Sequence, residues 1–515
     1  MADAQLLVGL DVGSTSIKAV VYRPDGTAIA RGSVPTPTHY PKPGWAYFLA
    51  EELWDGCVTA LRQALAEVDD PRAVVGVAVA SIGESVVPIA ADGTPTGEVV
   101  SWFDTRTRPQ ATWLDDVVGK DEIFRRTGLS RQPIFSLCKI LWFKQERPEE
   151  FARTVKWLMV ADYIAWRLSG EAVTDLSLAS RSLAMNLHAF DWDRDMLAAA
   201  GISPDVLAPL ASGGTRIGTV SADASRITGL PTTCAVSTGG HDHVCGAFAA
   251  GVVEPGQLLN SLGTAEAVFL AADAPLTDPE AGRQGYTQGA HVVGKRRYVL
   301  AGLYTSGACV TWVRDLLTAA GGEPPTYDAL FAQAAAAPAG SLGTCFLPHL
   351  RLANPPYDDP KSRGTFVGLS WDVNQGALVR SVLEGIAFEG RRSLESLVAF
   401  SGVVPPTSCV AIGGGTRNSL LMDIKATVMG IPVTVADAEE ATALGAALLA
   451  GLGAGVYANV DAALSAMTYP RHDVAAVPEW SSIYERIYRD VYTAIYDRVA
   501  PLSHALVDIV SGEPA

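Results

Sequence analysis

The chain opens with a strand–turn–strand pattern of apolar and small residues. Residues 6–12 (LLVGLDV) and 17–23 (IKAVVYR) are apolar runs typical of buried strands, and residues 13–16 (GSTS) form a tight turn between them. PDG at 24–26 predicts a second hairpin turn. A dinucleotide-binding domain would pass from its glycine-rich turn directly into a helix. Because a strand follows here, the pattern favours a different α/β fold.

The same pattern returns in the second half of the chain. Residues 256–274 (GQLLNSLGTAEAVFLAADA) contain an apolar strand, a Gly-Thr turn and another apolar strand. Two such units, one in each half, form a weak internal repeat. They predict two similar α/β domains that face one another across a cleft, with the boundary near residues 247–257.

Apolar periodicity predicts the remaining elements. The predicted helices are 51–68, 416–430 and 439–455, with helical patterns from about 108 to 168, and the predicted strands are 73–81, 234–239, 409–415 and 431–437. We therefore expect three parts: an N-terminal domain (1–250), a C-terminal domain (251–460) and a helical cap (461–515).

Composition narrows the class of protein. A chain of 515 residues is too long for one hydrophobic core, which supports two large domains. The net charge of −16 argues against nucleic acid and anionic membranes as partners. The start of the chain lacks a signal-peptide pattern, and no apolar run is long enough to predict a membrane span. The seven cysteines form no CxxC pair, so we expect reduced thiols and a cytoplasmic location.

The first candidate site is the N-terminal turn. Small residues at Gly13, Ser14 and Thr15 let backbone N–H groups approach a phosphate, and Lys18 adds positive charge nearby. Asp11 would repel a bare phosphate, so its expected partner is a hydrated Mg²⁺ ion. The alternative is an ordinary hairpin turn that uses glycine for its backbone conformation.

Two further glycine turns follow strands in the second half. Gly263 and Thr264 occupy the turn of the repeated hairpin, where a second phosphate loop is expected. Residues 413–415 and Asn418 lie between a strand and a helix, where glycines permit close approach of a flat ring or a phosphate. The sequence there is neither a Walker loop nor GxGxxG. The alternative is that both segments are ordinary structural turns that use glycine for its backbone conformation.

The GGHDH segment at 239–243 carries the candidate general base. Phosphoryl transfer needs positioning, charge neutralisation and one carboxylate that orients the nucleophile, and Asp242 suits that role. His241 and His243 suggest a metal site as an alternative. Zinc sites usually supply a third ligand at recognisable spacing, and none is evident, so hydrogen-bonded loop histidines are favoured.

A carboxylate pair beside an indole forms the candidate sugar pocket. Glu84 follows a predicted strand, and Trp102 is followed closely by Asp104 and Arg106. Carboxylates accept hydrogen bonds from sugar hydroxyls, and a ring face suits the C–H groups. The alternative is an Asp–Arg ion pair on the surface beside a core tryptophan. Such surface ion pairs are common and do not by themselves indicate a functional site.

Taken in order, these motifs resemble the FGGY family of carbohydrate kinases. DVGSTSIK (11–18) is similar to the family's N-terminal phosphate motif, although Ser14 stands where threonine is usual. FSLCKILWFKQE (135–146) and the segment 364–388 resemble the two family signatures, and Ala377 replaces a residue that is usually polar. GGGTRNSLL (413–421) resembles the adenine-side motif. The resemblance extends from about residue 6 to 457.

The resemblance implies two actin-like ATPase domains, with a ribonuclease H-like α/β fold, that close on ATP, Mg²⁺ and a small sugar or polyol. The implied roles are Asp242 as catalytic base and substrate contact; Asp11 and Asp242 beside the metal; Ser14, Thr15, Lys18, Gly263 and Thr264 at the phosphates; Gly307, Thr311, Gly414, Gly415 and Asn418 at the nucleoside; and Glu84, Trp102, Asp104 and His243 in the sugar pocket. A homodimer is left open.

The substrate is less sharply defined than the reaction. Xylulose kinases usually carry QMHG where this chain has SIGES, and glycerol kinases usually carry Arg-Glu where it has Gly83-Glu84. Ile134 stands where glycerol kinases place tyrosine. We expect a ketose or sugar alcohol of four to six carbons. The rivals are a glycerol kinase, a non-catalytic sugar and ATP sensor, a chaperone-like or actin-like ATPase, and a metal hydrolase that uses His241 or His243.

Overall fold

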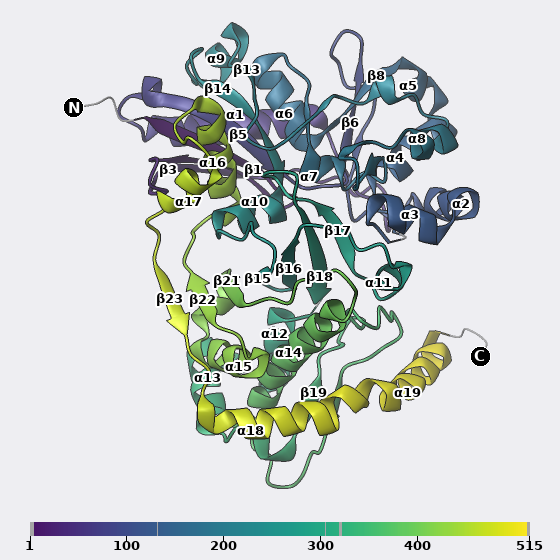
Figure 1. The fold of residues 1–515 in the computed structure, drawn as a ribbon, viewed down its shortest axis with the longest axis vertical. Coiled ribbons are helices and arrows are strands. Elements are labelled where there is room, and N and C mark those ends of the chain that lie inside the picture. Colours follow the sequence, from purple (N-terminus) through teal and green to yellow (C-terminus); the bar gives the residue numbers. More distant parts are fainter. Residues whose placement is uncertain (1–4, 131, 304, 319–321, 512–515) are drawn as a thin grey trace.

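The computed structural model describes residues 5–130, 132–303, 305–318 and 322–511, and it contains two large sheets, one above the other in Figure 1. The N-terminal sheet has the order β13-β14-β5-β1-β2-β3. Its strands are β1 (Leu6–Val12), β2 (Ser16–Tyr22), β3 (Ala28–Pro35), β5 (Val74–Ser81), β13 (Arg216–Thr219) and β14 (Ala235–His241). The first three form antiparallel hairpins, whereas β1, β5 and β14 run parallel.

The C-terminal sheet repeats this arrangement. Its order is β17-β18-β16-β15-β21-β22-β23. The strands are β15 (Gln257–Leu262), β16 (Glu266–Ala272), β17 (Thr287–Ala290), β18 (Arg297–Leu303), β21 (Ser408–Ile412), β22 (Val433–Ala436) and β23 (Arg471–Val474). Again an antiparallel hairpin, β15–β16, lies beside parallel strands, β15, β21 and β22. The prediction of two similar α/β units, each with a strand–turn–strand start, is confirmed.

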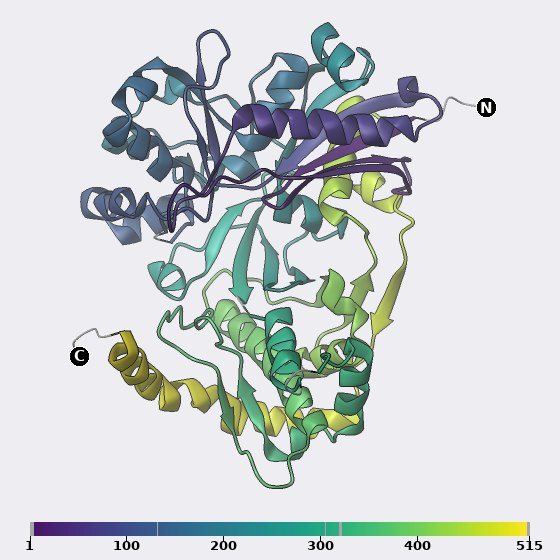
Figure 2. The ribbon, with the colours of Figure 1, turned by 180° about the vertical axis from the view of Figure 1, so that it is seen from behind.

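Helices cover both faces of the N-terminal sheet. One face packs against α1 (Ala50–Ala66), the purple helix in front of the sheet in Figure 2, and against α6 (Val160–Ser169). The other face packs against α16 (Ala441–Ala454), which also contacts α10 (Asp242–Ala249). Residues that alternate along a strand therefore point into two different cores. This double burial explains why the strands read as continuous apolar runs.

Helix α16 crosses the domain plan expected from the sequence. It lies within 251–460, the segment assigned to the C-terminal domain, yet it packs on the N-terminal sheet (Figure 1). Close approach explains the small residues: a Cβ at Gly9 would lie 1.8 Å from the Ala443 carbonyl oxygen, and one at Gly445 would lie 2.0 Å from that of Cys245. The chain thus passes between the two domains three times: at 249–257, again before α16, and once more after α16, when it returns to the edge of the C-terminal sheet.

The last segment differs from a purely helical cap. After α17 (Val460–Ser465), β23 joins the edge of the C-terminal sheet, and α18 (Pro478–Ile487) and α19 (Thr493–Ser511) then run along the far end of that domain (Figure 1). Strand β23 was missed because an edge strand is short and its side chains are largely polar. Residues 512–515 of the expected cap lie outside the described residues. In the part of the chain described here, none of the helices combines the length and apolar character needed to cross a bilayer.

The remaining elements complete the two domains. In the N-terminal half they are β4 (Tyr47–Phe48), β6 (Val86–Ala90), β7 (Val99–Val100), α2 (Arg108–Val118), α3 (Lys120–Thr127), α4 (Ser136–Glu146), α5 (Pro148–Arg153), β8 (Thr154–Met159), β9 (Thr174–Asp175), α7 (Leu176–Ala179), β10 (Met185–Asn186), β11 (Asp191–Trp192), α8 (Arg194–Ala200), β12 (Leu210–Ala211) and α9 (Ala222–Thr228). The C-terminal half adds α11 (Pro279–Arg283), α12 (Gly307–Leu316), α13 (Tyr327–Ala336), β19 (Cys345–Leu347), β20 (Thr365–Val367), α14 (Gln375–Val398) and α15 (Ser419–Met429).

Candidate active site

Three acidic residues converge because three neighbouring parallel strands end side by side. Asp11 lies at the carboxyl end of β1, Glu84 follows β5, and Asp242 follows β14. Ligands of open α/β sheets bind at this edge of the strands. All three residues line one cavity of about 500 Å³ between the domains. Its other lining residues are Gly13, Ser14, Thr15, Ser16, Ile82, Gly83, Trp102, Gln132, Ile134, Arg181, His241, His243, Gly285, Thr287, Leu300, Gly302 and Thr442.

Asp242 is fixed at the first position of α10. Its Oδ1 atom accepts the N–H of His243 at 2.6 Å, and Thr442 donates a hydroxyl hydrogen bond to its carbonyl oxygen at 3.5 Å. The carboxylate keeps 24% of its side-chain surface exposed. A carboxylate in the first turn of a helix also benefits from the helix dipole. Asp242 is therefore held by the backbone yet open to the cavity.

Asp11 faces the same space with an altered affinity for protons. Burial, followed by the negative charge of Asp242, raises the pKa of Asp11 to about 7, against the opposing effect of Lys18. A buried carboxylate whose proton affinity is raised by a neighbouring carboxylate is well placed to share a cation with that neighbour. The hairpin predicted at this site is present, since Asp11 pairs with Lys18 across β1 and β2 and residues 13–15 form the turn.

Lys18 already has a carboxylate partner. Its Nζ atom lies 2.7 Å from Oε2 of Glu440, the residue that precedes α16. Nearby, Arg31 pairs with Glu439 of the same loop. Lys18 is not among the residues that line the large cavity. The structure thus shows Lys18 in an ion pair between the N-terminal hairpin and the segment before α16.

The two histidines differ in environment. His241 is buried, which lowers its pKa to about 3, so its ring is neutral at pH 7. Its Nε2 atom lies 3.4 Å from Oδ1 of Asp242, whereas His243 is exposed to the cavity. Among the described residues, no group of three or more His, Cys, Asp or Glu side chains could hold a metal ion.

Glu84 is held in an unusual conformation by family-signature residues. Its φ angle is +63°, which is uncommon for a residue other than glycine. The buried Ser136 hydroxyl and Lys139 ammonium both donate to its carbonyl oxygen, at 2.9 and 2.8 Å. Arg181 donates from Nε to its carboxylate at 2.7 Å. Ser136 and Lys139 therefore hold the backbone of Glu84 in place from behind the cavity.

Trp102 and Asp104 were both predicted to line the sugar pocket, but only Trp102 reaches the cavity. Trp102 lines the cavity and is 40% exposed. Asp104 is 1% exposed and is absent from the lining. Its carboxylate accepts the N–H of Ala46 at 2.6 Å and the N–H and Nε–H of Arg106 at 2.7 and 3.0 Å. The expectation that Asp104 belongs to the sugar pocket is therefore corrected: it anchors the loop behind Trp102.

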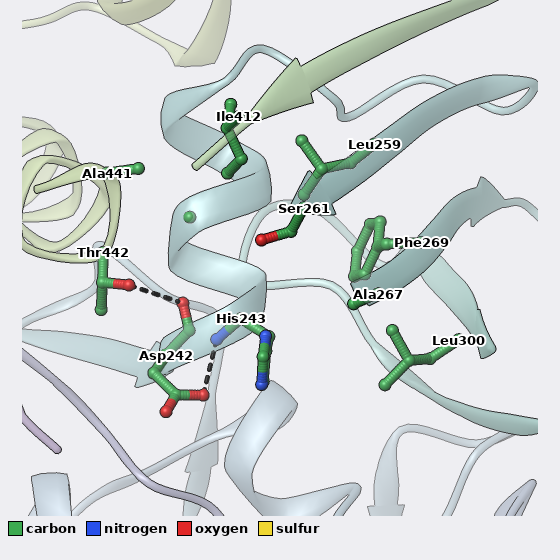
Figure 3. A pocket seen from close by; sticks show the side chains of 11 residues that line it. Asp242, His243, Leu259, Ser261, Ala267, Phe269, Leu300, Ile412, Ala441 and Thr442 are labelled. Carbon is green, nitrogen blue, oxygen red and sulfur yellow. Dashed lines mark hydrogen bonds between the residues drawn. The ribbon is translucent and has the colours of Figure 1, made fainter. Parts of the chain in front are cut away.

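A smaller cavity of about 60 Å³ extends from Asp242 toward the C-terminal sheet (Figure 3). Asp242, His243 and Thr442 lie on one side of it, and Ser261 points toward it from β15. Ser261 lies two residues before the Gly263-Thr264 turn. This cavity thus lies between the candidate base and β15, the strand that leads into the turn predicted to bind phosphate, although Gly263 and Thr264 are not among its lining residues.

The predicted nucleotide residues gather at the matching edge of the C-terminal sheet. Gly263 and Thr264 are exposed at the β15–β16 turn, and their carbonyls accept N–H groups from the start of α12, including Gly307. A Cβ at Gly307 would lie 2.6 Å from the Gly263 carbonyl oxygen. Gly307 therefore supports the turn, and its N–H is already bound. Residues 413–415 pack beside the same turn, because a Cβ at Gly413 or Gly415 would lie within 3 Å of Leu262.

The other two predicted nucleoside residues have local partners. Thr311 is exposed on α12, where its hydroxyl lies 3.2 Å from the Tyr327 hydroxyl. Asn418 caps α15 by accepting the N–H of Leu421, while its buried Nδ2 atom has no hydrogen-bond partner among the described residues. Gly414 is exposed, with no atom within 4 Å of a Cβ built on it. Thr311 and Gly414 are therefore exposed, whereas Asn418 is buried at the start of α15.

Several lining residues were not singled out from the sequence. Arg181 and Thr287 come from different domains and bond to each other, Nη1 to Oγ1, at 3.0 Å. Thr442 lies in a helix that was interpreted only as small and apolar. Arg181, Thr287 and Thr442 lie outside the glycine-rich turns, so no local sequence pattern indicated a functional role for them.

Comparison with known proteins now decides the family. The N-terminal domain of the FGGY family of carbohydrate kinases matches residues 6–249, and the C-terminal domain of that family matches residues 258–454. The chain belongs to the FGGY family of carbohydrate kinases. This FGGY kinase is 33% identical over 466 residues to a glycerol kinase of Gloeobacter violaceus, covering 88% of this chain and 89% of that protein.

Other relatives carry other names. An autoinducer-2 kinase of Escherichia coli is 29% identical over 523 residues, covering 97% of this chain and 96% of that protein. The solved xylulose kinase of Rhodospirillum rubrum superposes with a TM-score of 0.87 at 28% identity, covering 97% and 100%. The actin-like fold and the activity expected from the sequence are confirmed: this FGGY kinase transfers phosphate from ATP to a sugar or polyol.

Proposed function

We propose that this FGGY kinase phosphorylates a ketose or sugar alcohol of four to six carbons, with Asp242 as the general base. The observation that carries the proposal is the placement of Asp242, Glu84 and Trp102 around one cavity of about 500 Å³. That volume lies within the usual range for small-molecule sites. Glu84 and Arg181 supply acceptors and donors for hydroxyl groups, and Trp102 supplies a ring face.

The residues fit a magnesium ion. Mg²⁺ prefers oxygen ligands and is often bound by one or two carboxylates together with substrate phosphates. Asp11 and Asp242 provide two carboxylates, and the pKa of Asp11 is raised first by burial and then by the negative charge of Asp242, which a cation between them would offset. Such an ion would offset negative charge on the phosphates.

The mechanism follows from positions of the protein's own groups. Asp242 accepts the proton of a primary hydroxyl while the hydroxyl oxygen attacks the γ-phosphorus of ATP in line with the leaving ADP. The N-terminal turn at Ser14 and Thr15 and the turn at Gly263 and Thr264 direct small side chains and backbone toward the phosphates from opposite domains. Closing the domains excludes water, which limits ATP hydrolysis.

The test of the base is Asp242→Asn. This variant keeps the shape of the side chain but cannot accept the proton, so kcat should fall at least about 10³-fold while nucleotide binding changes little. A coupled ADP-release assay measures kcat, and calorimetry with an ATP analogue measures binding. Near-normal turnover in the variant would remove Asp242 from the role of base.

The substrate is tested by a panel of ketoses, the matching sugar alcohols, glycerol and gluconate. Glycerol is the second candidate because the glycerol kinase of Gloeobacter violaceus is a close match in sequence. Against it, the chain has Gly83 and Ile134 at the cavity, and neither side chain can donate a hydrogen bond to a hydroxyl. A kcat/KM for glycerol above that of every four- to six-carbon compound would overturn the preference.

Cytoplasmic action is part of the proposal. All seven cysteines are free and buried, which suits a reducing compartment. Whether two copies associate is left to a sedimentation measurement.

A further inference from the structure

Strand β14 loses one of its two neighbours before it reaches the catalytic residue. β13 and the two residues before it pair with β14 only as far as Thr238, which exchanges backbone hydrogen bonds with Gly214 and Thr215, whereas β5 continues beside β14 to His241. The register of β14 also shifts between Ser237 and Gly240. The backbone that leads directly to Asp242 is therefore held on one side by a strand and needs a different partner on the other.

A side chain supplies that partner. The Ser177 hydroxyl oxygen accepts the N–H of His241 at 2.8 Å. The Ser177 hydroxyl in turn donates to Oδ1 of Asp175, and the same oxygen accepts the N–H groups of Ser177 and Leu178 at 2.7 and 3.1 Å. Ser177 is 0% and Asp175 1% exposed. Asp175 therefore caps α7 and fixes the direction in which the Ser177 hydroxyl points.

Close packing leaves this contact little freedom. A Cβ at Gly240 would lie 2.9 Å from the Ser177 hydroxyl oxygen and 3.3 Å from Oδ1 of Asp175. The strand can approach the two polar side chains only because residue 240 is a glycine. One peptide unit then separates the bound N–H of His241 from the Cα atom of Asp242. A movement of this peptide would be passed directly to the catalytic carboxylate.

We infer that Ser177, oriented by Asp175, is a positioning residue for phosphoryl transfer: it binds the His241 peptide and thereby sets the direction of the Asp242 carboxylate. The inference rests on the proposed role of Asp242 as base. A displacement of about 1 Å at a reacting group can lower a rate by about 10²-fold. Loss of the Ser177 hydroxyl should therefore act on turnover more than on binding.

The test begins with Ser177→Ala. We expect kcat to fall at least tenfold while KM for ATP and for the best sugar stays within threefold of wild type. Asp175→Ala should behave alike, whereas Asp175→Asn keeps an accepting oxygen and should stay within threefold of wild-type kcat. The matched control is Ser182→Ala, because the Ser182 hydroxyl is equally buried but bonds only to Ala179 and Ala184 within its own turn.

A double variant separates positioning from general support of the fold. If Ser177 acts through Asp242, adding Ser177→Ala to Asp242→Asn lowers the residual activity no further. Three outcomes would overturn the inference. Ser177→Ala could lower kcat by the same factor in the Asp242→Asn background as in wild type, or it could leave kcat within twofold of wild type. Ser182→Ala could also lower kcat as much as Ser177→Ala does. If Ser177→Ala does not fold, the kcat values of Asp175→Asn and Asp175→Ala are compared instead. Equal kcat values for these two variants would refute the positioning role of Ser177. Failure of the proposed function is detected by a different result: the Asp242→Asn variant would then keep full activity.

Discussion

Asp11→Asn should abolish kinase activity and, at the same time, make the folded protein more stable. Burial and the charge of Asp242 raise the pKa of Asp11 from 3.8 to about 7. The unfolded chain releases this proton as the pH rises past 4, whereas the folded protein keeps it until the pH reaches about 7. The stability associated with Asp11 is therefore fully present at acid pH and is lost as the pH rises through this window.

The size of the effect follows from the shift in pKa. With 1.36 kcal/mol for each pKa unit, the penalty is about 2 kcal/mol at pH 5 and about 4 kcal/mol at pH 8. These are upper values, because the carboxylate borders an open cavity in which water screens the charge. Asparagine has nearly the same shape and no charge, so the variant escapes the penalty. Its advantage over wild type should grow by about 2 kcal/mol between the two pH values.

The assay is urea unfolding followed by tryptophan fluorescence at pH 5 and pH 8, without nucleotide. The matched control is Asp69→Asn, an exposed carboxylate in the loop after α1, which should show no such gain. Asp242→Asn should recover part of the effect, because it removes the second cause of the raised pKa. An Asp11→Asn variant that is no more stable than wild type at pH 8 would refute the electrostatic reasoning.

Three further predictions separate residues that contact ligands from residues that support them. Trp102→Ala should raise KM for the sugar about tenfold and leave stability within about 1 kcal/mol, since the ring is already 40% exposed; an unchanged KM would remove Trp102 from the pocket. Asp104→Ala should act on stability instead, lowering the free energy of unfolding by about 3 kcal/mol because it removes one of the two carboxylates that pair with the buried Arg106 and leaves only Glu98, while any folded enzyme keeps a sugar KM within threefold; a selective rise in sugar KM would contradict this. Gly307→Ala should raise KM for ATP at least tenfold by displacing the Gly263 carbonyl, which would lie 2.6 Å from the new Cβ, and calorimetry showing normal nucleotide affinity would argue against that support.

Local patterns were sufficient for the fold and for part of the site. The strand–turn–strand units at residues 6–23 and 256–274 became the β1–β2 and β15–β16 hairpins of the two sheets. Asp11, Asp242 and Glu84 could be found because each is a charged residue at, or within a few residues of, the carboxyl end of a predicted strand. The carboxyl ends of parallel strands meet at one edge, so such residues are brought together by the sheet itself.

Residues that depend on distant partners could not be assigned in this way. Asp104 and Trp102 are two positions apart and looked alike as pocket candidates, yet Asp104 turns to Ala46 and Arg106. Lys18 was expected at phosphate and instead pairs with Glu440, 422 residues away. Ser177 has no motif around it, and its importance comes from the unpaired edge of β14. In each case the partner is supplied by a different part of the chain.

The sequence by itself determined the two α/β units and the acidic strand ends, because periodicity and strand–turn residues act over a few positions. The kinase chemistry was implied by the resemblance of its ordered motifs to the FGGY family. Tertiary structure alone decided which polar side chain faces the cavity, which one is buried in a hydrogen-bond network, and which segment packs against which sheet. The physical reason is that a polar group must find a partner when it is buried, and the nearest partner in space is set by packing between elements far apart in the chain. Helix α16 is the clearest case: its small residues predicted a helix, but only its close approach to Gly9 of β1 and Gly76 of β5 shows which sheet it covers.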